Sequence, residues 1–182
     1  MENKEGFLSS HLEITLPLQT THSLDFLGLH QGYGLWEQAN YSESVIIGLL
    51  DSGIGPDHPS FSDEGVSPPS AKWKGKCEFN GTVCNNKLIG ARNFLGADRG
   101  NITRTPFDWN CHGTHTSSTT TRNFVKGTSM FGEANDTAMG MAPYVHLAMY
   151  RVCRGPGCTY GDILASLDAA VEDGLDVLSF LL

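Results

Sequence analysis

Apolar residues gather in three short segments of the chain, and each segment predicts a strand. Residues 45–50 (Val-Ile-Ile-Gly-Leu-Leu) form a continuous run rich in β-branched side chains, which is typical of a strand buried on both faces. Residues 146–152 predict a second strand, and residues 176–182 begin a third. Residues 55–110 are rich in Gly, Pro, Asn and Ser, so we expect long surface loops there.

A helix is predicted between the last two strands. Thr159 and Asp162 resemble a capping box, and Gly174 suits the C-cap. Strand, helix and strand joined by short links predict a parallel crossover. One helical face carries the apolar residues Ile163, Leu164, Leu167, Ala170 and Val171. The opposite, solvated face is expected to carry the acids Asp162, Asp168, Glu172 and Asp173.

Two ionisable residues stand where these elements end or begin. Asp51 follows the first apolar run, and His112 opens a helix predicted to extend to about Thr121, directly after Cys111. An aspartate that orients a histidine makes up two thirds of a triad that activates a nucleophile. Taken alone, Asp51 could equally cap a turn at a strand end, and His112 could be an ordinary surface histidine.

Composition and charge narrow the classes of function. The 182 residues give room for one domain, and 20 acids against 12 bases leave a net charge of −8 with no basic run. We therefore expect no nucleic-acid partner. No stretch reaches the ~18–20 apolar residues of a membrane span, and the first residues lack a signal-peptide pattern. Because neither a Gly-x-Gly-x-x-Gly motif nor a P-loop is present, no nucleotide cofactor is expected.

The cysteines leave several interpretations open. Cys77 and Cys84 enclose six residues, and Cys153 and Cys158 enclose four, so short-loop disulfides, reduced thiols and a metal site all remain possible. A Cys-x4-Cys pair lacks the common zinc spacing, and His112-x-x-His115 is not the i, i+4 pair of a zinc protease, so zinc is disfavoured. Four glycosylation sequons agree with a secreted parent protein: Asn40, Asn80, Asn101 and Asn135.

Nearly the whole chain consists of ordered motifs that resemble one family. They include 45–54 around Asp51, 58–63, 72–77, 84–92, 110–117 around His112, 140–143 and 162–165. In this order they resemble the front part of a plant subtilisin-like serine protease, a secreted subtilase of the cucumisin type. The order Asp then His is also that of subtilisin.

The resemblance implies a fold, a domain division and roles for the site residues. It implies an α/β fold with a subtilisin-like parallel sheet and flanking helices, here truncated. Residues 1–19 would be the remnant of an inhibitory pro-domain, and residues 20–182 an incomplete peptidase domain. Asp51 would be the orienting carboxylate and His112 the general base, with His115 structural. The implied disulfides are Cys77–Cys84 and Cys153–Cys158, which leave Cys111 free.

The nucleophile is expected outside these residues. Ser129 lies in Gly-Thr-Ser-Met, a copy of the start of the family's nucleophile motif, but Phe131-Gly132-Glu133 follows where small residues and a proline are usual. We therefore expect the nucleophilic Ser and the oxyanion Asn beyond residue 182, and an inactive chain by itself. Cys111 also departs from the family pattern, because a glycine usually precedes the catalytic histidine.

The parent activity implied by the resemblance is endopeptidase cleavage of polypeptides through an acyl-enzyme on serine. The alternative is a non-catalytic binding or decoy protein that keeps a subtilase fragment and binds a pro-domain or an inhibitor. The family implies an extracellular location, in the cell wall or apoplast. No cofactor or metal is expected.

Overall fold

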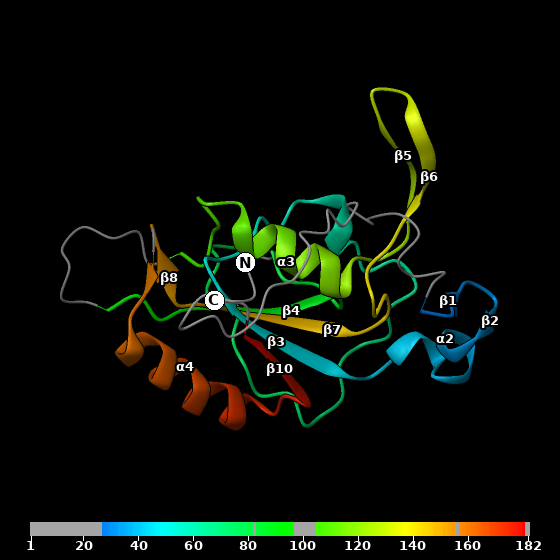
Figure 1. Cartoon of the computed structure of the whole chain (residues 1–182). Helices are drawn as coiled ribbons and strands as arrows, with labels where there is room; N and C mark the ends of the chain where they lie inside the picture. The colour runs from blue at the N-terminus through cyan, green and yellow to red at the C-terminus, as the bar shows by residue number, and fades with distance from the viewer. Residues whose placement is uncertain (1–26, 82, 97–104, 156, 181–182) are drawn as a thin grey trace, which may run out of the picture.

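A four-stranded parallel sheet forms the centre of the computed structural model, which describes residues 27–81, 83–96, 105–155 and 157–180. The strand order is β10-β3-β7-β4, and all three pairings are parallel. The strands are β3 (Ile46–Asp51), β4 (Leu88–Asn93), β7 (His146–Arg151) and β10 (Val177–Phe180). Helices α3 (His112–Thr121) and α4 (Tyr160–Asp173) lie on opposite faces of the sheet (Figure 1). The expected α/β class is confirmed.

The strand predicted from the first apolar run is β3, and every one of its residues is buried. Its neighbouring side chains point to opposite faces of the sheet. Leu49 packs in one apolar cluster with Met149, and Leu50 packs in a second cluster with Tyr150. Because both faces are covered, the run is apolar at nearly every position instead of alternating.

Most of the described residues in 55–110 form the predicted loops, but the segment also contains β4 and a 3-10 turn, η2 (Pro59–Phe61), which were not predicted. Tertiary contacts stabilise β4. A Cβ at Gly90 would lie 2.5 Å from the Trp73 ring, so this strand approaches its neighbours closely only because it carries glycine. Just before the strand, buried Lys87 donates from Nζ to the carbonyl oxygens of Pro143 (2.6 Å) and Val145 (2.8 Å).

Helix α4 has the predicted caps and part of the predicted buried face: Ala170 is buried, and Ile163 and Leu167 pack against the same apolar cluster. Thr159 Oγ1 accepts from the Asp162 N–H (3.3 Å), and Gly174 adopts the left-handed C-cap conformation. Leu164 and Val171, expected inside, are 61% and 82% exposed.

Asp173, expected on the solvated face of α4, is buried. It accepts hydrogen bonds from the hydroxyl of Tyr150 (2.8 Å) and from Nη1 of Arg92 (3.0 Å). Arg92 lies on β4 and Tyr150 on β7, so Asp173 faces the sheet because its hydrogen-bond partners are there. The predicted crossover strands β7 and β10 are parallel but not neighbours, since β3 lies between them.

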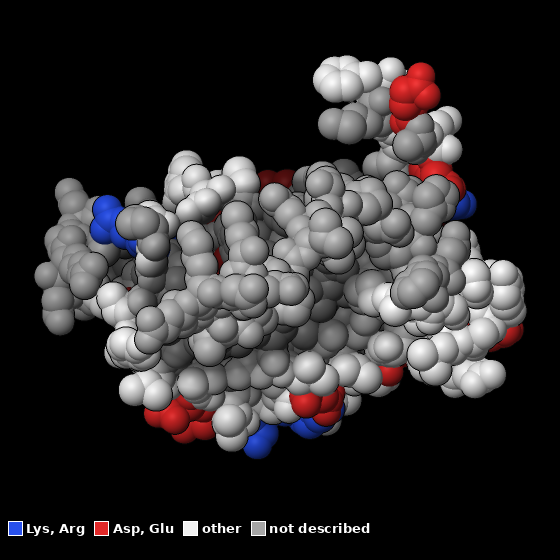
Figure 2. Space-filling view, in the orientation of Figure 1, with Lys and Arg blue, Asp and Glu red and all other residues white. Residues whose placement is uncertain are grey.

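The remaining elements are short and lie around the sheet. The β5–β6 hairpin projects from the body of the protein (Figure 1). On the face that Figure 2 shows, acidic side chains lie on this hairpin and also along the opposite edge of the molecule. The other elements are β1 (Leu29–His30), β2 (Tyr33–Gly34), α2 (Leu35–Gln38), η1 (Asn40–Ser42), β5 (Val125–Met130), β6 (Glu133–Ala138), β8 (Cys153–Arg154) and β9 (Gly157–Cys158).

Two disulfides, Cys77–Cys84 and Cys153–Cys158, have the pairing that the resemblance implies, and Cys111 is free and exposed. The second joins β8 to β9. The expected domain boundary at residue 20 falls outside the described residues. Within the described ranges, no helix is long and apolar enough to cross a membrane.

Candidate active site

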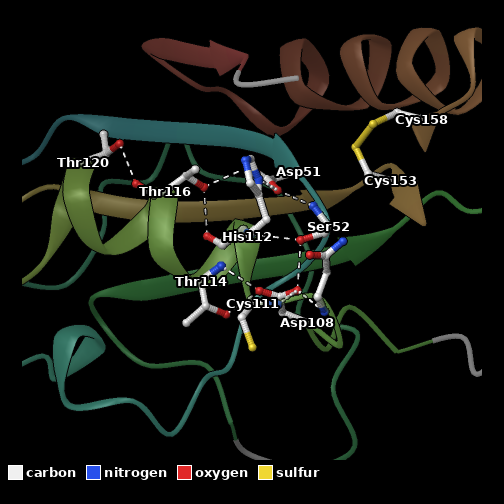
Figure 3. A network of polar contacts seen from close by, with 12 residues as sticks. Asp51, Ser52, Asp108, Cys111, His112, Thr114, Thr116, Thr120, Cys153 and Cys158 are labelled. Carbon is white, nitrogen blue, oxygen red and sulfur yellow. Dashed lines mark hydrogen bonds and ion pairs between the residues drawn. A yellow bond between two sulfur atoms is a disulfide. The ribbon is translucent and has the colours of Figure 1, made fainter. Parts of the chain in front are cut away.

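Asp51 and His112 form a hydrogen-bonded pair, although 61 residues separate them in the sequence. Asp51 is the last residue of β3, and His112 is the first residue of α3. Asp51 Oδ1 lies 2.8 Å from His112 Nδ1, as expected for a carboxylate that orients an imidazole (Figure 3). The Asp51 side chain is 1% exposed and that of His112 is 55% exposed, so one partner is fixed and the other is accessible.

Two further donors hold the Asp51 carboxylate. The N–H of Ser52 donates to Oδ1 (2.6 Å), and the hydroxyl of Thr116 donates to Oδ2 (2.8 Å). Because a carboxylate only accepts, the neutral His112 ring carries its proton on Nδ1 and leaves Nε2 as the acceptor. This tautomer is the one that a general base needs.

Protonation of His112 is favoured by its partner. The hydrogen bond that His112 donates to Asp51 is the largest cause that raises the pKa of His112, and the charge of Asp51 adds to it. Burial opposes this rise, and the more distant charge of Asp108 supports it. The pair is therefore arranged to stabilise an imidazolium, the state that forms when a base accepts a proton.

Glycine and a left-handed turn bring the helix to the strand. A Cβ at Gly113 would lie 2.2 Å from the carbonyl oxygen of Gly53, so only glycine lets the first turn of α3 approach the turn after Asp51. Cys111, the N-cap, has φ 69° in the left-handed region. This backbone conformation explains why a glycine would suit the position before the histidine.

Thr116 and Asp108 contact the site or its surroundings but were not predicted from the sequence. Thr116 stands four residues after His112 and therefore lies on the same face of the helix. This spacing could have indicated that Thr116 also faces Asp51. Asp108 accepts from the N–H two residues ahead, as aspartates in turns often do. Its link to the turn after Asp51 is visible only in the folded chain.

The other candidate residues lie apart from the pair. Ser129 is exposed on β5, in the hairpin that projects from the body (Figure 1). His115 is exposed and, with Cys111 and Arg122, lines a pocket of about 530 Å³ along another side of α3. No group of three or more His, Cys, Asp or Glu residues in the described ranges could hold a metal ion.

Three of the four sequon asparagines are exposed, namely Asn40, Asn80 and Asn135. Asn101 lies outside the described residues.

Known proteins with similar sequences cover nearly the whole chain. A sequence model of the "Subtilase family" (Peptidase_S8) matches residues 42–180. Subtilisin-like protease SBT1.4 of Arabidopsis thaliana is 45% identical over 89% of this chain and 23% of its own length. SBT1.9 of the same plant is 40% identical over 100% of this chain and 26% of its own length. SBT3 of Solanum lycopersicum is 40% identical over 96% of this chain and 24% of its own length. The chain thus spans about a quarter of the length of these curated relatives.

Proposed function

The chain belongs to the subtilase family, and we propose that it supplies the orienting carboxylate and the general base of a serine-type endopeptidase acting on polypeptides. The observation that supports this most directly is the 2.8 Å bond between buried Asp51 and the half-exposed ring of His112. A buried acid that fixes one imidazole nitrogen and leaves the other accessible has the geometry of a base ready to activate a hydroxyl.

The proposed reaction uses a serine from sequence that these 182 residues do not contain. Nε2 of His112 takes the serine proton as Oγ attacks the carbonyl carbon of the scissile peptide. Asp51 stabilises the imidazolium that forms. His112 then donates the proton to the leaving amine, which breaks the C–N bond and leaves an acyl-enzyme. Water, deprotonated by His112, then attacks the ester carbonyl, the C–Oγ bond breaks, and His112 returns the proton to the serine Oγ as the acid product leaves.

A chimera tests this role. Residues 42–180 would replace the matching segment of SBT1.4, which keeps that protease's remaining sequence. We expect the chimera to hydrolyse a peptide substrate, His112→Ala to lower kcat by about 10⁶-fold, and Asp51→Asn by about 10⁴-fold.

His115→Ala is the matched control, since His115 lies one turn along the same helix and outside the pair. It should keep most of the activity. Full activity in His112→Ala would refute the proposed base.

The 182 residues by themselves are proposed to be inactive. A fluorophosphonate probe reacts only with an activated serine and should leave this chain unlabelled. Labelling that disappears in Ser129→Ala would instead make Ser129 a nucleophile. If the chain stays unlabelled yet binds a subtilase pro-domain, as a pull-down would detect, the alternative role of a binding or decoy protein gains support.

An extracellular location, with residues 1–19 as a pro-domain remnant, is part of the same proposal. Two disulfides and three exposed sequons support an oxidising, glycosylating compartment. N-terminal sequencing and glycan analysis of the protein purified from its natural tissue would test both points.

A further inference from the structure

A buried carboxylate outside the Asp51–His112 pair accepts five hydrogen bonds at the start of α3. Oδ1 of Asp108 accepts from the hydroxyl of Ser52 (2.9 Å) and from the N–H groups of Asn110 and Cys111 (both 3.0 Å). Oδ2 accepts from the N–H (2.8 Å) and the hydroxyl (2.7 Å) of Thr114 (Figure 3). This concentration of donors exceeds what a simple turn requires.

Asp108 is charged at neutral pH in spite of its burial. Burial by itself raises the pKa of Asp108, but the hydrogen bonds from Thr114, Ser52 and the Asn110 backbone outweigh this effect, and the net pKa lies below its ordinary value. A fixed negative charge therefore stands at the N-terminal end of α3, where the helix dipole favours it.

The first function of these bonds is to cap α3. The N-cap, Cys111, makes no side-chain cap bond, so the first N–H groups of the helix need another acceptor. Asp108 accepts from two of these backbone groups, those of Cys111 and Thr114. The same bonds hold the left-handed turn at Cys111, which sets the direction in which His112 leaves the loop.

The second function is a link to the strand that ends in Asp51. The hydroxyl of Ser52, the next residue, donates to Asp108 and accepts from the N–H of Gly113 (2.9 Å). One hydroxyl thus joins the turn after Asp51, the loop that carries Asp108 and the turn that carries His112.

We propose that Asp108 is a positioning residue: through Ser52 and the first turn of α3, it holds Asp51 and His112 within hydrogen-bond distance. Its catalytic meaning rests on the proposed peptidase function. Asp108 has no hydrogen bond to either member of the pair, so it acts by fixing the two elements that carry them.

NMR spectroscopy of the 182-residue chain tests the proposal without requiring activity. The readouts are the downfield Nδ1–H resonance of His112 and the pKa of its ring. Asp108→Asn removes the charge and leaves at least two donors without an acceptor. Asp108→Glu keeps the charge but displaces the carboxylate. Ser52→Ala keeps every charge and cuts the link. In all three variants, we expect the resonance to weaken and the pKa to fall toward about 6.5.

The variants separate positioning from a purely electrostatic effect. If Asp108 acted only through its charge, Asp108→Glu and Ser52→Ala would keep the parental pKa and resonance, and the proposal would be wrong. The proposal would also be wrong if Ser52→Ala alone changed the His112 resonance and pKa while both Asp108 variants behaved like the parent chain. Should the Asp108 variants fail to fold, Ser52→Ala decides by the same readouts.

Asp57→Asn is the matched control, because Asp57 is an exposed carboxylate on the pocket beside α3. It should leave both readouts unchanged. A chimera without peptidase activity would contradict the proposed function. The NMR readouts of the 182-residue chain do not depend on activity, so they would still test the role of Asp108.

Discussion

The two main helices are attached to the same sheet by different forces. Helix α3 has the sequence His-Gly-Thr-His-Thr-Ser-Ser-Thr-Thr-Thr, without one large apolar side chain. Helix α4 packs Ala169 and Ala170 into an apolar cluster with Tyr150 of the sheet. Hydrophobic burial has no preferred direction, so it holds a helix against a sheet but does not fix a hydrogen bond to within a few tenths of an ångström. Directional hydrogen bonds can fix such a distance, and α3 carries His112, the proposed general base.

The hydroxyls of α3 also satisfy its own backbone. Thr119, Thr120 and Thr121 each donate to the carbonyl oxygen four residues earlier, at 2.9–3.1 Å. The Thr116 hydroxyl donates to Asp51 at 2.8 Å and also lies 3.1 Å from the carbonyl oxygen of Gly113. A helix of small polar residues can therefore approach a polar strand end closely. Helix α3 is thus positioned by hydrogen bonds at the candidate site, and α4 by packing in the apolar core.

The largest effect is expected at Asp173, a buried acid that links the last turn of α4 to the sheet. Asp173→Ala leaves Arg92 and the hydroxyl of Tyr150 without their buried partner, so the free energy of unfolding should fall by about 3 kcal/mol. Chemical denaturation measures this. Asp168→Ala, an exposed acid on the same helix, should change it by less than about 0.5 kcal/mol. Equal effects would mean that apolar burial alone attaches α4.

Each helix has one glycine at its second position, Gly113 in α3 and Gly161 in α4, and the two should respond oppositely to alanine. Gly113→Ala in α3 places a Cβ against the Gly53 carbonyl, and we expect a loss of about 2 kcal/mol from overpacking. Gly161→Ala in α4 meets no atom within 4 Å, and the better helix propensity of alanine should stabilise the chain by about 0.5 kcal/mol. Denaturant midpoints of both variants measure this, and the same sign for both would contradict the close approach.

The two N-caps should respond in opposite directions. Cys111→Gly relieves a left-handed conformation and should raise the free energy of unfolding by about 1 kcal/mol. Thr159→Ala removes a side-chain cap and should lower it by about 1 kcal/mol. Thermal unfolding of both variants measures the difference. A destabilised Cys111→Gly variant would show that the thiol itself supports the turn.

The smallest effect is a pH dependence confined to the α3 side. Because Asp51 raises the folded-state pKa of His112, their pairing stabilises the chain fully below the unfolded pKa of about 6.5. This contribution is lost as the pH rises through the raised folded pKa. Because the His112 ring is half exposed, this contribution to the free energy of unfolding stays below about 1 kcal/mol. The free energy of unfolding of Asp51→Asn and of the parent chain would be measured by denaturation from pH 5 to 9. The difference between the two isolates the contribution of the pair. A difference that does not change with pH would contradict the coupling.

Local sequence patterns determined the elements that depend on their own residues. The β-branched run predicted β3, and Thr159 with Gly174 predicted both ends of α4, because strand burial and helix caps are properties of neighbouring residues. The motifs around Asp51 and His112 predicted the family, which the comparisons confirm. The hydrogen bond between the two side chains also agrees with the prediction, since a strand end and a helix start fix their positions.

Tertiary structure alone decided the rest. Strand β4 has a short apolar segment interrupted by Gly90, and it forms because β7 and Trp73 lie beside it. Asp173 looks like a surface acid in a helical pattern, but Arg92 and Tyr150 lie beneath it. Asp108 connects to Ser52 across 56 residues. No local pattern encodes these contacts, because each depends on partners that only the folded sheet brings within hydrogen-bond or van der Waals distance.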